Sequence, residues 1–241
     1  MLEKSDNGFF MAFFTKSVFY FLFLQMQNSQ LTVFSTAYFP PVSYLSQCLK
    51  EGRFLIETQE TYPKQTYRNR CVITTANGLQ SLTVPVRKPF GNQTRTAEIK
   101  ISEADPWQRL HKRALETAYK ASPFYDFYID DLLPVFNQQY ETLMTLNDRA
   151  FKLILKLLKI DLSYTYTTQY AQSSAFEADY RNTFSPKSPF QKDVFPEYYQ
   201  VYAHKYPFQA DLSILDLLFN EGPQGIIYLK NLANFNPDKQ S

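Results

Sequence analysis

Short apolar runs separated by turn residues mark the first hundred residues of the chain. Residues 31–34 (LTVF) form an apolar run with a β-branched residue, which is typical of a buried strand. The turn Tyr38–Pro41 (YFPP) follows, and residues 42–50 then have apolar residues at helical spacing. Residues 53–57 (RFLIE) return as a second strand. The pattern predicts a parallel strand–helix–strand unit.

The next segment predicts antiparallel pairing. Residues 70–75 and 79–86 flank the tripeptide Ala76–Asn77–Gly78, and Asn-Gly between apolar runs is a strong β-hairpin signal. Residues 97–101 (AEIKI) alternate between apolar and polar positions, which predicts one more strand. We therefore expect a mixed sheet over residues 31–103.

Helical periodicity dominates the rest of the chain. Residues 105–160 contain amphipathic stripes, and residues 212–233 predict a final helical pair broken at Gly222. Between them, residues 161–195 are polar, tyrosine-rich and aperiodic, which indicates a long ordered loop or lid. The predicted fold class is α/β, with a mixed N-terminal sheet and a mostly helical C-terminal half in one domain over residues 26–241.

The first 25 residues form an apolar leader with three interpretations. The apolar run 9–24 is shorter than the roughly 20 residues that span a bilayer, and Thr15, Lys16 and Ser17 interrupt it. A basic start and a small-residue cleavage site, as in a signal peptide, are both missing. We prefer a mis-assigned start upstream of Met26 to an apolar anchor or a signal peptide. A chain that starts at Met26 is expected to be cytoplasmic and free of membrane.

Charge and cysteine content exclude several classes of function. The net charge of +2 is too small for a protein that binds duplex nucleic acid. The two cysteines, Cys48 and Cys71, form no CxxC pair, and the two histidines complete no zinc spacing. We expect reduced structural thiols, no metal site and no required cofactor.

A dense cationic segment precedes the predicted hairpin. Arg68 and Arg70 alternate with Asn69, so on a strand both arginines would share one face. The planar guanidinium matches carboxylate or phosphate oxygens, and Lys64 and Lys88 could complete the site. This pattern predicts binding of a small anionic ligand.

The cationic segment has an alternative interpretation, and the sequence also offers a second anion site. The cationic segment could instead be a solvated hairpin face neutralised by Glu57 and Glu60. The turn Tyr38–Pro41 offers a second anion site, because it leads from a strand into a helix N-terminus with free N–H groups. Its alternative is a rigid proline turn with Tyr38 and Phe39 packed inward.

His111 is the histidine with the more suggestive setting. It shares a predicted helix face with Trp107 and Tyr119. A histidine there could act as a general base, because its usual pKa lies near physiological pH. The competing interpretation is a hydrogen-bonded histidine in the core.

Several segments together resemble the WbqC-like family of bacterial proteins. They are YFPP at Tyr38–Pro41, KQTYRNRC at 64–71, LTVPV at 82–86, Trp107 with His111, Ala118–Tyr119 with Ser122–Pro123–Phe124, and LSILDLLFNEGP at 212–223. The resemblance implies a surface-polysaccharide (O-antigen) gene setting and acyl or aminoacyl transfer to an amino-sugar nucleotide. In that interpretation the arginines bind the pyrophosphate, Tyr38 or Trp107 stacks on the ligand, and His111 takes the amine proton.

This sequence departs from the family pattern at two places. Many members carry His-Gln-Pro before the tyrosine–phenylalanine–proline turn and acidic residues after the second strand. This chain has Ser35–Thr36–Ala37 and Glu57–Thr58–Gln59 there. If His-Gln-Pro is catalytic, this chain belongs to a branch with an altered reaction. Two alternatives to a transferase remain: a magnesium-dependent, nucleotidyltransferase-like protein, and a non-catalytic binding or scaffold protein.

Overall fold

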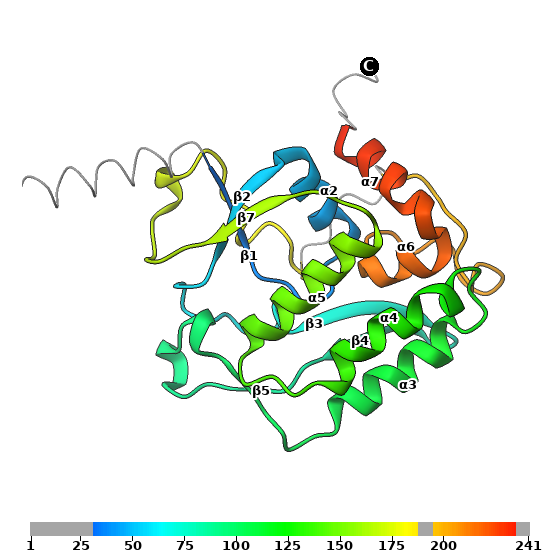
Figure 1. Cartoon of the computed structure of the whole chain (residues 1–241), viewed down its shortest axis with the longest axis horizontal. Helices are drawn as coiled ribbons and strands as arrows, with labels where there is room; N and C mark the ends of the chain where they lie inside the picture. Colours follow the sequence, from blue (N-terminus) through cyan, green and yellow to red (C-terminus); the bar gives the residue numbers. More distant parts are fainter. Residues whose placement is uncertain (1–30, 188–194, 235–241) are drawn as a thin grey trace, which may run out of the picture.

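A three-stranded parallel sheet with the order β1-β2-β7 organises the N-terminal half of the protein (Figure 1). The computed structural model describes residues 31–187 and 195–234, so the leader lies outside the described residues. β1 (Thr32–Ser35) pairs in parallel with β2 (Arg53–Glu57), and α2 (Val42–Glu51) connects them. The predicted strand–helix–strand unit is confirmed.

The third strand lies where the sequence predicted a loop. β7 (Ser163–Tyr166) pairs in parallel with β2, although it falls within the segment 161–195. Its sequence, SYTY, favours a strand by residue type but has no apolar alternation, and all four of its side chains are at least partly exposed. Its strand structure therefore depends on pairing with β2, which local pattern does not reveal.

The predicted hairpin is also present. β3 (Arg70–Thr75) and β4 (Gly78–Thr83) pair in antiparallel register from Arg70 with Thr83 to Thr75 with Gly78. The strand expected over 79–86 ends earlier, and β5 (Val86–Arg87) instead pairs with β6 (Lys100–Ile101). Most of the strand expected at 97–101 is absent, because a 3-10 turn, η2 (Thr96–Glu98), takes its first half.

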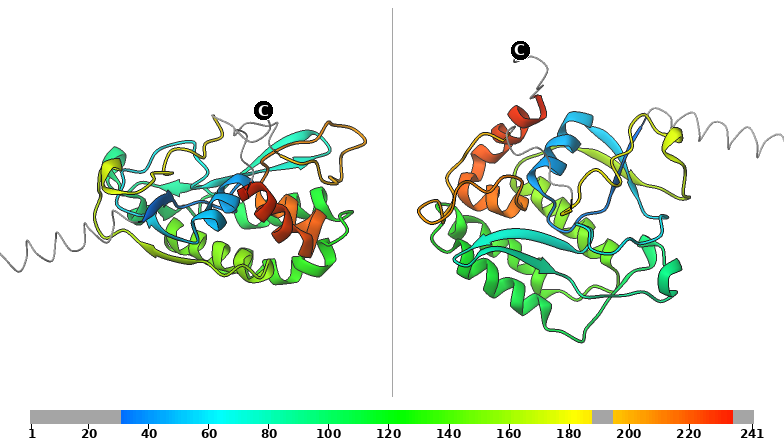
Figure 2. Two further views of the ribbon diagram at one scale, coloured as in Figure 1. Left: turned by 90° about the horizontal axis from the view of Figure 1, so that it is seen from above. Right: turned by 180° about the vertical axis from the view of Figure 1, so that it is seen from behind.

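Five helices supply the remaining regular structure among the described residues together with short 3-10 turns. After α2 they are α3 (Trp107–Tyr119), α4 (Tyr125–Asn137), α5 (Leu143–Leu157), α6 (Ile214–Glu221) and α7 (Gly225–Asn234). Seen from above in Figure 2, α3, α4 and α5 form a layer on one side of the strands. The helical C-terminal half is confirmed.

One continuous hydrophobic cluster joins the sheet to these helices. It includes Phe34 of β1, Phe54 of β2 and the fully buried Leu218 of α6. The opposite face of the parallel sheet presents Val33 and Leu55, which pack with Phe176 in a smaller cluster. The polar segment after β7 thus covers one face of the sheet.

The N-terminus of α2 is filled by groups of the chain itself. The backbone N–H and the hydroxyl of Ser43 each donate to the carboxylate of Asp211 at 2.8 Å, and the N–H of Val42 donates to the carbonyl of Leu212 at 3.0 Å. Burial raises the pKa of Asp211 to about 7, although the hydrogen bonds from Ser43 oppose that shift. The carboxyl group of Asp211 therefore occupies the place where an external anion was expected at the Tyr38–Pro41 turn.

A second buried carboxylate anchors the tyrosine-rich segment before α6. Asp216 accepts hydrogen bonds from the hydroxyls of Tyr119 at 2.8 Å and Tyr198 at 2.6 Å, and from the amide of Gln200 at 3.0 Å. Burial raises the pKa of Asp216, while these donors lower it. The contacts hold the described part of this segment against α3 and α6.

Gly222 brings two motif segments into direct contact. It ends α6 with a positive φ of 53°, a conformation that L-residues rarely adopt. A Cβ atom built at this position would lie 2.5 Å from the Phe124 ring. The segment LSILDLLFNEGP therefore packs on Ser122–Pro123–Phe124 only because residue 222 has no side chain.

We predict that Gly222→Ala lowers the free energy of unfolding by about 2 to 4 kcal/mol, because a methyl group adds overpacking to the strain of a positive φ. Urea denaturation measures the change. The matched control is Gly91→Ala, where φ is also positive at 57° but no atom lies within 4 Å of the added Cβ. Gly91→Ala should cost about 1 kcal/mol, and equal losses in both variants would contradict the packing argument.

We also predict a pH dependence that originates at Asp211. Its pKa is about 7 in the folded protein and about 3.9 in an unfolded chain, so the folded state holds the extra proton. Asp211 therefore makes the free energy of unfolding fall as the pH rises from about 4 to 7, by at most about 1.4 kcal/mol per pH unit. Asp211→Asn should remove that slope, and asparagine tolerates the positive φ of 55° at this position.

Denaturation of wild type and Asp211→Asn at pH 4, 5, 6, 7 and 8 tests this expectation. The stability of wild type minus that of the variant should decrease up to pH 7 and stay level above it. A difference that increases with pH would show that the ionised carboxylate is the form that the folded state prefers.

Candidate functional site

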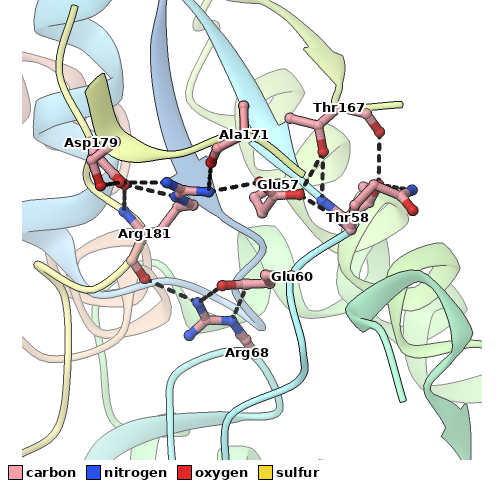
Figure 3. A network of polar contacts seen from close by, with 10 residues as sticks. Glu57, Thr58, Glu60, Arg68, Thr167, Ala171, Asp179 and Arg181 are labelled. Carbon is pink, nitrogen blue, oxygen red and sulfur yellow. Dashed lines mark hydrogen bonds and ion pairs between the residues drawn. The ribbon is translucent and has the colours of Figure 1, made fainter. Parts of the chain in front are cut away.

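A buried network of arginines and carboxylates lies at the carboxyl edge of the parallel sheet (Figure 3). Glu57, the last residue of β2, is 0% exposed and accepts a hydrogen bond from Nη1 of Arg181 at 3.0 Å. The hydroxyl of Thr167 donates to the same carboxylate at 2.7 Å. Arg181 also holds Asp179 with two bonds, from Nε at 2.9 Å and from Nη2 at 2.6 Å. The chain after β7 is thereby fixed to the end of β2.

Arg68 belongs to this network and not to the hairpin surface. Its Nε and Nη2 donate to the two carboxylate oxygens of Glu60 at 2.7 and 2.9 Å, and Nη2 also donates to the carbonyl of Arg181 at 3.0 Å. Burial raises the pKa of Glu60, although Arg68 acts in the opposite direction. Arg68 is only 2% exposed, and its planar guanidinium forms a bidentate contact with a carboxylate of the chain itself, that of Glu60.

The prediction that Arg68 and Arg70 share one face of a strand is wrong. β3 begins at Arg70, so Arg68 lies in the preceding loop and turns inward to Glu60. Asn69 is buried as well, and its amide donates to the carbonyl of Val84 at 2.8 Å. The physical reason is that the buried carboxylate of Glu60 needs a positively charged partner, and the Arg68 guanidinium turns inward to pair with it.

Tyr38, Trp107 and His111 come together, as three buried rings under the β3–β4 hairpin. The ring centroids of Trp107 and His111 lie 5.2 Å apart, and those of Tyr38 and Trp107 lie 6.3 Å apart. The Tyr38 hydroxyl lies 3.0 Å from Nδ1 of His111. Burial raises the pKa of Tyr38 well above its usual value, so this hydroxyl keeps its proton and donates it.

The setting of His111 matches that of a hydrogen-bonded core histidine. Burial lowers the pKa of His111 to about 4, and a backbone hydrogen bond with Thr83 offsets only part of the shift. The ring is therefore neutral at physiological pH, and Nδ1, the nitrogen that would accept a proton, already accepts one from Tyr38. His111 is 4% exposed, so its ring is packed among its neighbours and has almost no contact with solvent.

The other cations remain at the surface and form what we call the cationic cluster: Lys64, Arg70 and Lys88 around Tyr62. The Lys88 ammonium donates to the carbonyl of Tyr62 at 3.1 Å and lies 5.1 Å from the centre of the Tyr62 ring. Burial lowers the pKa of Lys88, and the charge of Lys64 lowers it further. Like charges are therefore close together in this cluster.

Two buried polar atoms of the cationic cluster have no partner. They are Nε of Arg70 and the hydroxyl of Tyr62, whose side chain is 4% exposed. Burial raises the pKa of Tyr62 to about 12, against the opposing charges of Arg68 and Arg70, so the hydroxyl stays protonated and can donate. Within residues 31–187 and 195–234, Lys64, Arg70 and Lys88 form no ion pair with a carboxylate.

Both cysteines are buried in the core, and the described residues contain no group arranged as a metal centre. Cys48 and Cys71 are both free and buried, and burial raises the pKa of Cys71 to about 12, so its thiol is not a nucleophile. Among the described residues, no group of three His, Cys, Asp or Glu side chains is arranged to hold a metal ion. Over the same residues, no helix has the length and apolar character needed to cross a bilayer.

Sequence reasoning missed two groups of polar residues at the sheet edge. Arg181 lay in an aperiodic segment, and no local signal links it to Glu57 over 124 positions. Asn147 and Asp148 lay within the helical stripe that became α5, where polar residues are expected to face solvent. Asn147 is instead 1% exposed and donates to the carbonyl of Arg68 at 2.8 Å.

Comparison with known proteins places this chain in a family. Residues 36–183 match the model of the WbqC-like protein family, which covers more than half of the chain. The chain is 28% identical to "Uncharacterized protein Rv1507c" of Mycobacterium tuberculosis, over 83% of this chain and 97% of that protein. No solved structure matches the chain. On the strength of the family match, this protein belongs to the WbqC-like protein family.

Proposed function

We propose that this protein binds an amino-sugar nucleotide through the cationic cluster and transfers an acyl or aminoacyl group to the sugar amine, as a step in surface-polysaccharide biosynthesis. The observation that supports ligand binding is the unpaired state of the cluster. Within the described part of the chain, Lys64, Arg70 and Lys88 lie near Tyr62 without a carboxylate partner, and Nε of Arg70 and the Tyr62 hydroxyl are buried without a hydrogen-bond partner. A pyrophosphate bound to these cations would relieve the repulsion between Lys64 and Lys88.

The geometry changes the roles expected of the other site residues. Arg68 and Asn69 brace the loop between β2 and β3, which carries Lys64. Tyr38, Trp107 and His111 pack beneath the hairpin that Arg70 begins. We propose that all five position the cationic cluster and do not touch the ligand.

The proposed reaction forms an amide. The sugar amine attacks the carbonyl carbon of an activated acyl or aminoacyl group, the new C–N bond forms, and the bond from that carbon to its leaving group breaks. The amine loses one proton, the leaving group departs with its electron pair, and the departing thiolate or alkoxide takes up that proton. The donor must be an activated ester or thioester, because a free carboxylate would not release its oxygen without activation. The cationic cluster holds the nucleotide and leaves the sugar end free to react.

We predict that Lys64→Ala, Arg70→Ala and Lys88→Ala each weaken binding of a UDP-amino sugar by about tenfold to a hundredfold, because each removes a charge-assisted hydrogen bond. Isothermal titration calorimetry at low salt measures the affinity, which should also fall as salt is added. Lys156→Ala, at an exposed lysine on α5 remote in sequence from the cluster, is the matched control and should bind like wild type. Equal affinity in all four variants would remove the cationic cluster as the site.

Transfer itself needs a separate measurement. Wild type is incubated with a UDP-amino sugar and an acyl-coenzyme A or aminoacyl thioester, and the nucleotide is analysed by mass spectrometry. We expect a mass increase equal to the acyl group, with a rate at limiting sugar nucleotide that falls in Lys88→Ala. If the protein binds the UDP-amino sugar but forms no product with either class of donor, the transferase proposal fails and the protein is a binding protein.

A further inference from the structure

A small cavity lies where the carboxyl ends of the parallel strands meet α5. Its wall includes Thr36 after β1, Tyr166 at the end of β7, and Met144, Asn147 and Asp148 of α5. The cavity holds about 10 Å³, which is room for one group the size of a water molecule. Carboxyl edges of parallel sheets are where α/β proteins commonly bind their ligands.

Asn147 supplies a buried acceptor with no partner. Its Nδ2 donates to the hydroxyl oxygen of Thr36 at 3.0 Å and to the backbone carbonyl of Arg68 at 2.8 Å. A backbone carbonyl can only accept, so these bonds identify which amide atom is nitrogen and which is oxygen. The remaining atom, Oδ1, is buried and unpartnered, although the residue is 1% exposed. A buried acceptor without a partner destabilises the folded protein, and a ligand that donates a hydrogen bond to Oδ1 would remove that free-energy cost.

Asp148 adds a carboxylate, ion-paired with Lys152, on the solvent side of the cavity. Its carboxylate accepts hydrogen bonds from Lys152 at 2.8 Å, from the Tyr164 hydroxyl at 3.0 Å, and from the Tyr166 hydroxyl. Burial alone would raise the pKa of Asp148, but these hydrogen bonds outweigh it and hold the pKa below its usual value. The Asp148 side chain is 25% exposed and Tyr166 is 40% exposed, so both border the solvent.

We propose that this cavity binds the primary ammonium group of a small ligand. An ammonium carries three donors and no acceptor, and it can bond to Asn147 Oδ1 while its charge faces Asp148. The rings of Tyr44 and Phe151 are also part of the wall, and aromatic rings favour a cation. The ligand ammonium would share the Asp148 carboxylate with Lys152, whereas a neutral hydroxyl would gain less from that carboxylate.

The inference deepens the proposed function and rests on it for the identity of the ligand. Two sources could supply the ammonium: the amino sugar that accepts the group, or an aminoacyl donor. The cavity is distinct from the cationic cluster, because none of the residues that line it is Tyr62, Lys64, Arg70 or Lys88. Binding at one place can therefore be lost while binding at the other is kept.

Methyl NMR of wild-type protein tests the proposal directly. Met144 lines the cavity, and the other three methionines all lie in the first 26 residues, so its ¹³C-methyl signal is readily assigned with Met144→Leu. The probes are glucosamine and glycinamide, with N-acetylglucosamine and N-acetylglycinamide as neutral counterparts. We expect a saturable shift of the Met144 signal with at least one amine and none with the acetylated compounds.

The two amine probes separate the sources of the ammonium. A shift with glucosamine alone identifies the acceptor sugar, and a shift with glycinamide alone identifies an aminoacyl donor. A Met144 signal that moves with neither amine, or equally with the acetylated compounds, would overturn the proposal.

Substitutions then test whether the Asp148 carboxylate contributes to amine binding. Asp148→Asn should weaken amine binding at least tenfold, whereas Asp131→Asn, at an exposed aspartate on α4, should not change it. Lys64→Ala should also leave amine binding unchanged, which distinguishes this inference from a failure of nucleotide binding at the cationic cluster. Wild-type amine affinity in a folded Asp148→Asn would overturn the role of the carboxylate, and should that variant not fold, the NMR result on wild type decides alone.

Discussion

The burial of two arginine–carboxylate pairs is the constraint on which this architecture depends. Glu57 ends the central strand of the parallel sheet with no exposure to water, and a buried carboxylate is tolerated only with a partner that satisfies it. Arg181 is that partner, and its backbone carbonyl in turn accepts a bond from Arg68, which holds Glu60. Removing one arginine would leave a carboxylate unpaired in the interior, typically at a cost of about 3 to 5 kcal/mol. The pairs therefore tie three separate segments to one edge of the sheet.

Hydrogen bonds outside the arginine network bring together two of the segments that resemble the WbqC-like family, the YFPP turn and the start of α6. The hydroxyl of Ser213 donates to the carbonyl of Phe39, and the N–H of Ile214 donates to the carbonyl of Pro40. Phe39 has a positive φ of 40°, a strained conformation for a bulky residue, and these bonds from the start of α6 hold it there. The YFPP turn is thus a docking point for the C-terminal helices as well as the start of α2.

Local signals in the sequence predicted the local parts of this fold. Pro41, the Asn77–Gly78 pair and the amphipathic stripes act within a few residues, so the strand–helix–strand unit, the hairpin and the helices followed from pattern alone. Strand β7 and the partners of Arg68 could not be predicted in this way, because both depend on residues that only the folded chain brings together. Of the predicted anion site, Lys64 and Arg70 remain at the surface, while Arg68 is internal because Glu60 is buried beside it.

The place of β7 in the sheet has a consequence for how the chain is made. β2 and β7 pair although they lie about 110 residues apart, whereas β1 and β2 are separated by one short helix. A ribosome therefore releases the apolar strand RFLIE long before its second neighbour exists, and one edge of β2 stays open during that interval. Such non-local parallel pairing forms slowly, since closure of a long loop precedes any gain from contact. Nascent chains that end before residue 163 expose an aggregation-prone edge, and α3, α4 and α5, which emerge in between, are the elements available to shield it.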